Sequence, residues 1–295
     1  MGTIERSQHD IYPFISPHAH LKHAAKGKTI LITGGSKGIG KATALQFALA
    51  SADAVIITAR GLPSLKDTKA SVQAAAPHCD IISVAADITD PASVQRLFDS
   101  LPRTPDVLVN NAGVSLSQDS IVNSDTDKWW ADWEINVKGL YLCTRTYLRA
   151  LAGKPGVILN VSSSVSDMVS PNLSSYATTK TAVNRFTEAV HLEHAKQGVR
   201  CIAFHPGGIA ETGMGQTAPP QFRSRLYDTV DLAGGTALYL STEPATFLSG
   251  RFVFSNWDME QVEKLESEIE SDGLLTSRIR FGDKLGMNVV PPDRA

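Results

Sequence analysis

A glycine-spaced turn between an apolar run and a helical pattern restricts the fold of this chain more than any other feature. The run Thr29–Thr33 leads directly into Gly34, Gly38 and Gly40, where a helical pattern begins. Glycines are needed where a backbone turns sharply, approaches a pyrophosphate closely and packs a new helix against a strand. The helix N-terminus then offers amide donors to phosphate groups. The turn therefore predicts a strand–turn–helix unit that binds a dinucleotide, with a ligand-free turn as the alternative.

The alternation of strand and helix continues along the chain. Short apolar runs predict seven strands, at Thr29–Thr33, Ala54–Thr58, Ile81–Ala85, Val107–Asn110, Val157–Val161, Arg200–Phe204 and Arg251–Phe254. Amphipathic stretches predict six helices, at Ile39–Ser51, Leu65–Ala75, Pro91–Leu101, Asp127–Leu151, Ser174–Gln197 and Val230–Ser241. Several strands are almost entirely apolar, as expected when both faces are covered. The pattern predicts a three-layer, doubly wound α/β Rossmann fold around a seven-stranded parallel sheet.

Two segments lie outside this alternation. Residues 1–27 are polar and lack a sustained period, which predicts an arm that lies on the surface or is partly disordered. Residues 258–295 are predicted to form a C-terminal tail or helix after the main domain, which spans 28–257. The arm contains three closely spaced histidines without an acidic or cysteine partner, so we expect no metal.

Composition restricts the partners of the chain. Its 295 residues carry a formal net charge of −2 and no basic stripe, which argues against nucleic-acid binding. No apolar run approaches the roughly 18 residues of a membrane span, and the N-terminal stretch lacks the features of a signal peptide. The three cysteines are far apart, as is typical of reduced thiols. The sequence therefore predicts a cytoplasmic protein that binds a small molecule and no membrane.

The end of the second predicted strand indicates which dinucleotide binds. An acidic residue there would accept hydrogen bonds from the adenosine ribose hydroxyls, but Ala59 and Arg60 occupy this position. A 2′-phosphate would meet a cation there instead of a repelling charge. Lys37, inside the glycine turn, adds a second positive group. These residues predict NADP(H), with an ordinary surface charge at Arg60 as the alternative.

Tyr176 and Lys180 form a Tyr-x3-Lys pair at the beginning of a predicted helix. Because residues i and i+4 share one helix face, about 5–6 Å apart at Cβ, the ammonium can lie beside the phenol. An adjacent cation stabilises the phenolate, so we expect Lys180 to lower the pKa of Tyr176 from its ordinary value near 10. A tyrosine poised in this way can exchange a proton with a carbonyl or hydroxyl oxygen while hydride moves to or from a nicotinamide.

These motifs and their order resemble the short-chain dehydrogenase/reductase family, over about residues 28–256. The matching elements are the Thr-Gly-x3-Gly-x-Gly turn, Asn110-Asn111-Ala112-Gly113 after the fourth strand, and the Tyr-x3-Lys pair. The segment Leu248–Asp258 resembles a subgroup common in fungal secondary metabolism. The resemblance implies a single-domain, NADP(H)-dependent member of the family.

The resemblance implies four catalytic residues: Asn136, Ser163, Tyr176 and Lys180. Ser163 lies thirteen residues before Tyr176, and its hydroxyl would hold and polarise the substrate oxygen. Serines on both sides leave this register uncertain by one, and a hydrogen-bonded turn is the alternative role. Asn136 would keep a water chain running from Lys180 to solvent.

The resemblance also implies the cofactor contacts. Asp87 would hold the adenine ring, and Thr212 would hold the nicotinamide carboxamide. The family most often has Asn where His205 stands, and we expect a structural histidine there. The residues predicted to bind the cofactor are Gly34, Ser36, Lys37, Gly38, Ile39, Gly40, Arg60, Asp87, Ile88, Asn111, Ala112, Gly113, Tyr176, Lys180, Pro206, Gly207, Ile209 and Thr212.

The expected function is hydride transfer between NADP(H) and a mostly apolar ketone or secondary alcohol, as in a natural-product ketoreductase. The alternative is an NADP-binding scaffold with a cyclase-like or partner-binding role. Substrate choice is expected from the lid 213–228 and from the loop 165–173. Arg223 and Arg225 of the lid are expected to be exposed charges, with a clamp for a substrate carboxylate as the alternative. Trp129, Trp130 and Trp133 of the helix 127–151 are expected in the core or in a subunit contact, with a pocket lined by the i, i+4 pair Trp129 and Trp133 as the alternative. The resemblance implies a homodimer or homotetramer.

Overall fold

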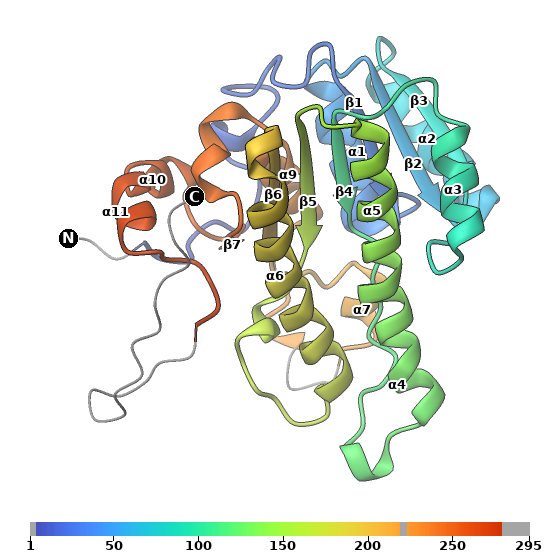
Figure 1. Cartoon of the computed structure of the whole chain (residues 1–295), viewed down its shortest axis with the longest axis vertical. Coiled ribbons are helices and arrows are strands. Elements are labelled where there is room, and N and C mark those ends of the chain that lie inside the picture. Colours follow the sequence, from blue (N-terminus) through green and yellow to red (C-terminus); the bar gives the residue numbers. More distant parts are fainter. Residues whose placement is uncertain (1–3, 219–222, 279–295) are drawn as a thin grey trace.

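The computed structural model describes residues 4–218 and 223–278, which are organised around one parallel sheet. The strand order is β3-β2-β1-β4-β5-β6-β7 (Figure 1). The strands are β1 Thr29–Thr33, β2 Ala54–Ala59, β3 Asp80–Ala85, β4 Val107–Asn110, β5 Gly156–Val161, β6 Val199–His205 and β7 Phe252–Phe254. All seven predicted strands are confirmed, and with them the doubly wound α/β fold. The predicted bounds of β1 and β4 are correct because every residue of these strands is buried.

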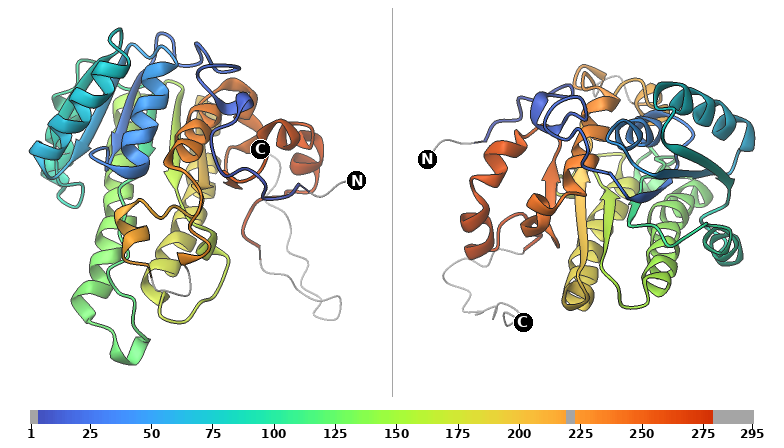
Figure 2. Two further views of the ribbon diagram at one scale, coloured as in Figure 1. Left: turned by 180° about the vertical axis from the view of Figure 1, so that it is seen from behind. Right: turned by 90° about the horizontal axis from the view of Figure 1, so that it is seen from above.

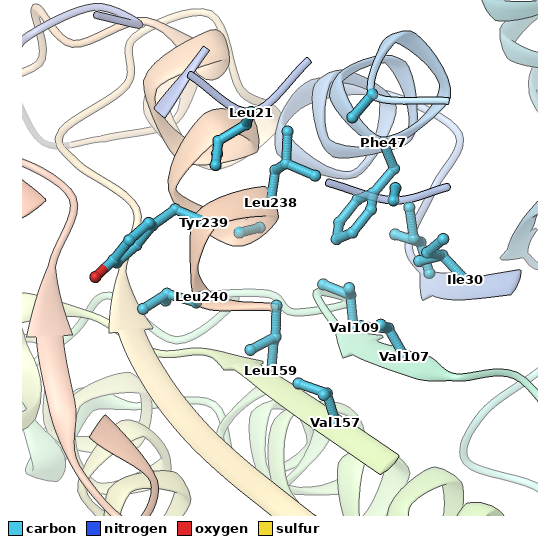
Figure 3. Packing of buried hydrophobic residues seen from close by; sticks show 14 of the residues in the cluster. Leu21, Ile30, Phe47, Val107, Val109, Val157, Leu159, Leu238, Tyr239 and Leu240 are labelled. Atoms are coloured by element: carbon cyan, nitrogen blue, oxygen red, sulfur yellow. The ribbon is translucent and has the colours of Figure 1, made fainter. Parts of the chain in front are cut away.

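Helices cover both faces of the sheet (Figures 1 and 2). One face carries α1 Gly38–Leu49, α2 Leu62–Ala75 and α9 Val230–Leu240, and the other carries α3 Pro91–Asp99, α5 Leu140–Leu151 and α6 Ser174–His194. Ile30 and Ile32 of β1 pack on the side of α1, α2 and α9, and Leu31 packs on the side of α3, α5 and α6. Figure 3 shows the packing on the α1 side of the sheet, where side chains of β1, β4 and β5 meet α1 and α9. No helix within 4–218 and 223–278 has the length and apolar content to cross a membrane.

The helix predicted over Asp127–Leu151 is interrupted. The structure has α4 Thr126–Trp133, a π-helical segment Glu134–Gly139 and then α5. The cause is tertiary, because the Asn136 side chain bonds to the backbone N–H and carbonyl of Val114, on a neighbouring loop. Such π-helical turns are frequent at functional sites.

The N-terminal arm is integrated into the core, which its polar composition did not predict. Ile15, Leu21 and Ala25 are buried against residues of α1 and α9. The short 3₁₀ helix Pro13–Ile15 contacts α9 and α10 Met259–Glu263, and both views of Figure 2 show the arm beside these elements. The expectation of a partly disordered arm is therefore wrong for residues 4–27.

The segment after β7 also joins the main core. It forms α10 and α11 Glu266–Ser271, whose Met259, Val262 and Ile269 are buried in the same cluster as the arm. The phenol of Tyr12 donates to the Trp257 carbonyl at 3.3 Å and accepts the Met259 N–H at 2.8 Å. The arm and the C-terminal helices therefore stabilise each other on one side of the sheet.

Replacing Ile15 with Ala tests whether the arm belongs to the core. Ile15 is fully buried, so we expect the free energy of unfolding to fall by about 2–5 kcal/mol in urea denaturation. His18→Ala is the matched control, because His18 is exposed on the same arm and should change stability by less than about 0.5 kcal/mol. Equal stabilities of the two variants would mean that the arm is only a surface segment.

Candidate active site

A cleft of about 1370 Å³ opens at the carboxyl ends of the strands. Its walls come from the β1–α1 turn, the ends of β2 to β4, the beginning of α6 and the segment after β6. Neighbouring β1 and β4 mark the point where the strand order reverses, which is where doubly wound sheets hold ligands. Pockets for a single small ligand occupy about 300–1,000 Å³. The cleft therefore has room for a dinucleotide and a second molecule.

The β1–α1 turn has the geometry of a phosphate cradle. Gly34 has φ +66°, and a Cβ on Gly40 would lie 2.4 Å from the Gly34 carbonyl oxygen. Helix α1 therefore approaches the turn this closely only because residue 40 has no side chain. No side chain caps α1, and its first turn has no acidic residue. The first amides of α1 are thus available to phosphate oxygens, and the turn fits a dinucleotide.

The end of β4 is joined to this turn by a set of short hydrogen bonds. The Asn111 Nδ2 donates to the carbonyls of Thr33 at 2.9 Å and of Gly34 at 3.1 Å. The Thr33 hydroxyl accepts the N–H groups of Asn111 and Ala112, each at 3.1 Å. Asn111 therefore fixes the cleft floor, and its side-chain donors are used within the protein.

Two cations line the cleft near the β1–α1 turn and the end of β2. Arg60 follows β2, is exposed and lines the cleft. Lys37 lines it as well, with its ammonium beside Gly213, where a Cβ would be 3.2 Å away.

The Asp87 Oδ1 accepts bonds from the Thr89 N–H and hydroxyl, at 2.9 and 2.8 Å. These bonds, and to a smaller extent the charge of Arg60, lower the pKa of Asp87.

Ser163, Tyr176 and Lys180 meet at the centre of the cleft. Ser163 follows β5, while Tyr176 and Lys180 lie one turn apart on α6, and all three are buried and line the cleft. The Lys180 Nζ donates to the Val161 carbonyl at 2.7 Å and lies 5.6 Å from the centre of the Tyr176 ring. The ammonium is therefore beside the phenol, as the i, i+4 spacing predicted.

Burial shifts the pKa values of this pair in opposite directions. It raises the pKa of Tyr176 to about 12, against a lowering contribution from the Ser163 hydroxyl. It lowers the pKa of Lys180 to about 8, against the negative charge of Asp132, which raises it. The pKa of Tyr176 is therefore raised and not lowered, contrary to the expectation, because the loss of hydration and the negative charge of Asp132 both raise it.

Asn136 lies in the π-helical segment and is buried behind Lys180. Its Oδ1 accepts the Val114 N–H at 2.8 Å, and its Nδ2 donates to the Val114 carbonyl at 2.8 Å and to the Thr179 hydroxyl at 3.1 Å. A Cβ on Gly113 would lie 3.2 Å from the Asn136 Oδ1 and 3.5 Å from the Lys180 Nζ. The side chains of Asn136 and Lys180 thus flank the same glycine.

Asp132 is a site residue that the sequence did not single out. It is fully buried one helical turn before Asn136, with its Oδ1 accepting the Leu116 N–H at 2.8 Å. Its Oδ2 has no hydrogen-bond partner among the described residues. Burial raises the pKa of Asp132, whereas the backbone bonds and the charge of Lys180 lower it. A buried acid in an aromatic helix gives no periodic signal, so only the fold reveals its proximity to Lys180.

The segment after β6 lines the cleft with Pro206, Gly207, Ile209 and Thr212. The Thr212 hydroxyl accepts the Gly215 N–H at 3.0 Å and so caps the short helix α7 Gly213–Gln216. His205 also faces the cleft, and its Nδ1 lies 3.2 Å from the Ser164 N–H, which donates to it. Burial lowers the pKa of His205 to about 4. His205 is therefore neutral and hydrogen-bonded, as expected of a structural histidine, although it also borders the cleft.

The remaining wall of the cleft is mostly apolar. Its side chains include Leu116, Trp130, Met168, Leu173, Met214 and Leu226. Trp130 is 57 % exposed and lines the cleft, so the expected place in the core is wrong for this residue. Residues 219–222 of the predicted lid lie outside the described residues. Arg225 of the lid lines the cleft. The Arg223 Nε donates to the Ala218 carbonyl at 3.0 Å.

The fold and the cleft define a dinucleotide-binding α/β protein. The family model described as short chain dehydrogenase matches residues 28–222. The chain belongs to this family of oxidoreductases, which use NAD or NADP and act on small molecules. The family predicted from the motifs is therefore confirmed.

Fungal proteins are among the relatives. The short chain dehydrogenase mpl6 of Monascus purpureus is 33% identical over 97% of this chain and 96% of its own length. The short chain dehydrogenase andI of Emericella variicolor is 34% identical over 94% and 96%.

Solved structures share the fold. An NAD⁺-bound xylitol dehydrogenase has a TM-score of 0.72 at 24% identity, covering 78% of this chain and 98% of that one. The 3-ketoacyl-(acyl-carrier-protein) reductase of Brucella melitensis, complexed with NADH, has a TM-score of 0.70 at 28% identity and covers 78% and 97%.

The contribution of Asp132 to the ionisation of Lys180 can be measured directly. Because the Asp132 charge raises the pKa of Lys180, Asp132→Asn should move that pKa below its wild-type value of about 8. Competitive acetylation of Lys180 at graded pH, read by mass spectrometry, measures the shift. Asp127→Asn is the control, because Asp127 is exposed on the same helix. An unchanged titration in Asp132→Asn would show that the two charges do not interact.

Proposed function

We propose that this chain is an NADP(H)-dependent reductase that transfers hydride between nicotinamide and a mostly apolar ketone or secondary alcohol. One observation carries the proposal: Ser163, Tyr176 and Lys180 are buried in the same cleft that the β1–α1 phosphate cradle opens into. A phosphate cradle alone is compatible with many functions. A hydroxyl, a phenol and a buried ammonium beside it are the groups that carbonyl reduction needs.

In this proposal, Ser163 and Tyr176 hold the carbonyl oxygen of the substrate. The cofactor, when bound, supplies or accepts the hydride. With a pKa of about 12, Tyr176 keeps its proton at neutral pH and can donate it to the oxygen as negative charge develops there. Lys180, with a pKa of about 8, is the stronger acid of the pair and can return a proton to the phenolate. Asn136, next to Lys180 across Gly113, is the residue that we assign to the water path toward solvent.

The choice of NADP(H) rests on the residues at the end of β2. Ala59 and Arg60 offer no carboxylate to the ribose hydroxyls, and the Arg60 guanidinium is exposed at the rim of the cleft. Arginine binds phosphate through charge-assisted hydrogen bonds. Lys37 lines the same cleft and adds to its positive charge.

The substrate proposed is a natural-product ketone, which agrees with the apolar wall of Leu116, Met168, Leu173 and Leu226 and with the fungal relatives. We also propose a cytoplasmic homodimer or homotetramer. Tyr141 on α5 and Leu192 on α6 are 45% and 65% exposed, which supports a contact between these helices of two copies.

Tyr176→Phe tests the chemistry. The variant keeps the ring but loses the proton donor, so ketone-dependent NADPH oxidation should fall by about 10²- to 10⁴-fold. NADPH binding, followed by fluorescence titration, should remain nearly unchanged. Tyr141→Phe, on the exposed face of α5, is the matched control and should retain full activity. Retained turnover in Tyr176→Phe would favour a cofactor-binding scaffold with a non-redox role.

Arg60→Ala tests the cofactor preference. Loss of a hydrogen bond to a charged group should weaken NADPH binding by about 10- to 100-fold and leave NADH binding unchanged. Fluorescence titration with both cofactors measures the ratio. Lys66→Ala, on exposed α2 outside the cleft, is the control and should leave both affinities intact. Equal effects on the two cofactors would contradict a 2′-phosphate contact.

A further inference from the structure

The N-terminal arm reaches the active-site cleft as well as the core. Arg6 and His9 are among the residues that line the cleft, although they lie more than 150 residues before the catalytic candidates of α6. The arm is held there by two hydrogen bonds between Gln8 and Asn256. The Gln8 N–H donates to the Asn256 carbonyl at 3.0 Å, and the Asn256 Nδ2 donates to the Gln8 carbonyl at 2.8 Å.

The end of the lid fixes the arm a second time. The Asp228 Oδ1 lies 2.6 Å from the His9 Nδ1, and its Oδ2 accepts the Gly208 N–H at 2.6 Å. The Thr229 N–H donates to the His9 carbonyl at 3.0 Å. Asp228 is buried, and both of its carboxylate oxygens are engaged. This acid therefore positions the arm and is not available as a partner for Arg6.

Arg6 lies at the substrate end of the cleft. Its guanidinium carbon is 3.8 Å from the centre of the Phe254 ring, and that ring contacts His205 at a centroid distance of 5.2 Å. His205 in turn accepts the Ser164 N–H, next to Ser163. Two aromatic rings thus separate the guanidinium from the serine that we assign to the substrate oxygen.

Arg6 is too far from Arg60 to serve the same phosphate. Arg60 follows β2, whereas Arg6 packs on β7, and five strand spacings separate these two strands. At about 4.8 Å for each spacing, the separation is roughly 24 Å. Within residues 4–218 and 223–278, no carboxylate lies within 4 Å of the Arg6 guanidinium. Burial and the charge of Arg6 also keep His205 neutral, since both lower its pKa.

We propose that Arg6 binds a carboxylate on the carbonyl substrate, so that the arm selects keto acids with an apolar spacer between the two groups. The inference rests on the proposed reductase function and narrows its substrate class. The apolar wall would contact the spacer, and the guanidinium would pair with the acid at the far end. The sequence indicated a mostly apolar substrate because the lid and the loop contain no cluster of charges, and Arg223 and Arg225 of the lid were expected to be exposed to solvent.

The test compares acids with their own esters. The probes are 4-acetylbenzoate and 6-acetyl-2-naphthoate, which differ in spacer length, each beside its methyl ester. Two readouts are used: kcat/KM for NADPH oxidation, and the dissociation constant of each probe from the enzyme–NADP⁺ complex by thermal shift. The wild type should favour at least one acid over its ester by about 10- to 100-fold, the range of a hydrogen bond to a charged group.

Variants assign the preference to Arg6. Arg6→Gln should abolish it without changing the ester constants, and Arg6→Lys should restore part of it. Lys22→Gln is the matched control, because Lys22 is an exposed cation on the same arm outside the cleft. A wild type that does not distinguish acid from ester, or a preference that survives in Arg6→Gln, would overturn the inference. A preference lost only in Arg225→Gln would assign the anion to the lid and would also overturn it.

The two readouts separate this inference from the reductase proposal. If no ketone is reduced but acid binding depends on Arg6, the anion site stands and the reductase proposal fails. If ketones are reduced and Arg6→Gln behaves like the wild type, the reductase proposal stands and the anion site fails.

Discussion

The close contact between the ends of β1 and β4 is the constraint on which the rest of the cleft depends. Thr33 accepts two backbone N–H groups from the β4 loop, and Asn111 returns two bonds to the carbonyls of the β1 turn. These bonds satisfy backbone groups at the point where the chain order reverses, so that the two loops can diverge and leave a space between them. The absence of a side chain at Gly40 lets α1 begin against this junction. Cofactor cradle and sheet are therefore one structural unit.

The charged and titratable groups of the cleft belong to different parts of the sheet. Arg60 follows β2, the Lys37 ammonium lies beside Gly213, the buried pair Tyr176 and Lys180 lies beside the end of β5, and Arg6 packs on β7. The buried pair differs from the others because desolvation controls it: burial favours the neutral form of both residues, which leaves the phenol protonated and makes the ammonium more acidic. Asp132 opposes this effect for Lys180 alone. The electrostatic balance of the centre thus depends on an acid that α4 contributes.

The sequence predicted correctly the elements whose structure depends on residues that are close together in the chain. The bounds of β1 and β4 are correct because their runs are buried on both faces, and the positions of Tyr176 and Lys180 follow from helical spacing alone. The interruption between α4 and α5 was missed because the apolar period continues through it and its cause, Asn136 bonding to Val114, is a contact across 22 residues. The arm was missed for a related reason. Its buried residues are too sparse for a period, and many of their partners lie far along the chain, on α9 and α10.

The two sides of the cleft are held by different kinds of contact. The cofactor side consists of strand ends, buried glycines and backbone bonds, so a side-chain substitution there disturbs the core as well as the ligand site. The substrate side is assembled from the arm, the lid and the segment after β5, and the arm is fixed by a few bonds at Asn256, Asp228 and Thr229. Arg6 precedes the anchored residues Gln8 and His9, so its side chain can differ without changing the fold. Substrate selection is therefore physically separable from cofactor binding here, and the two are coupled mainly through Asp228, which contacts both the arm and the loop after β6.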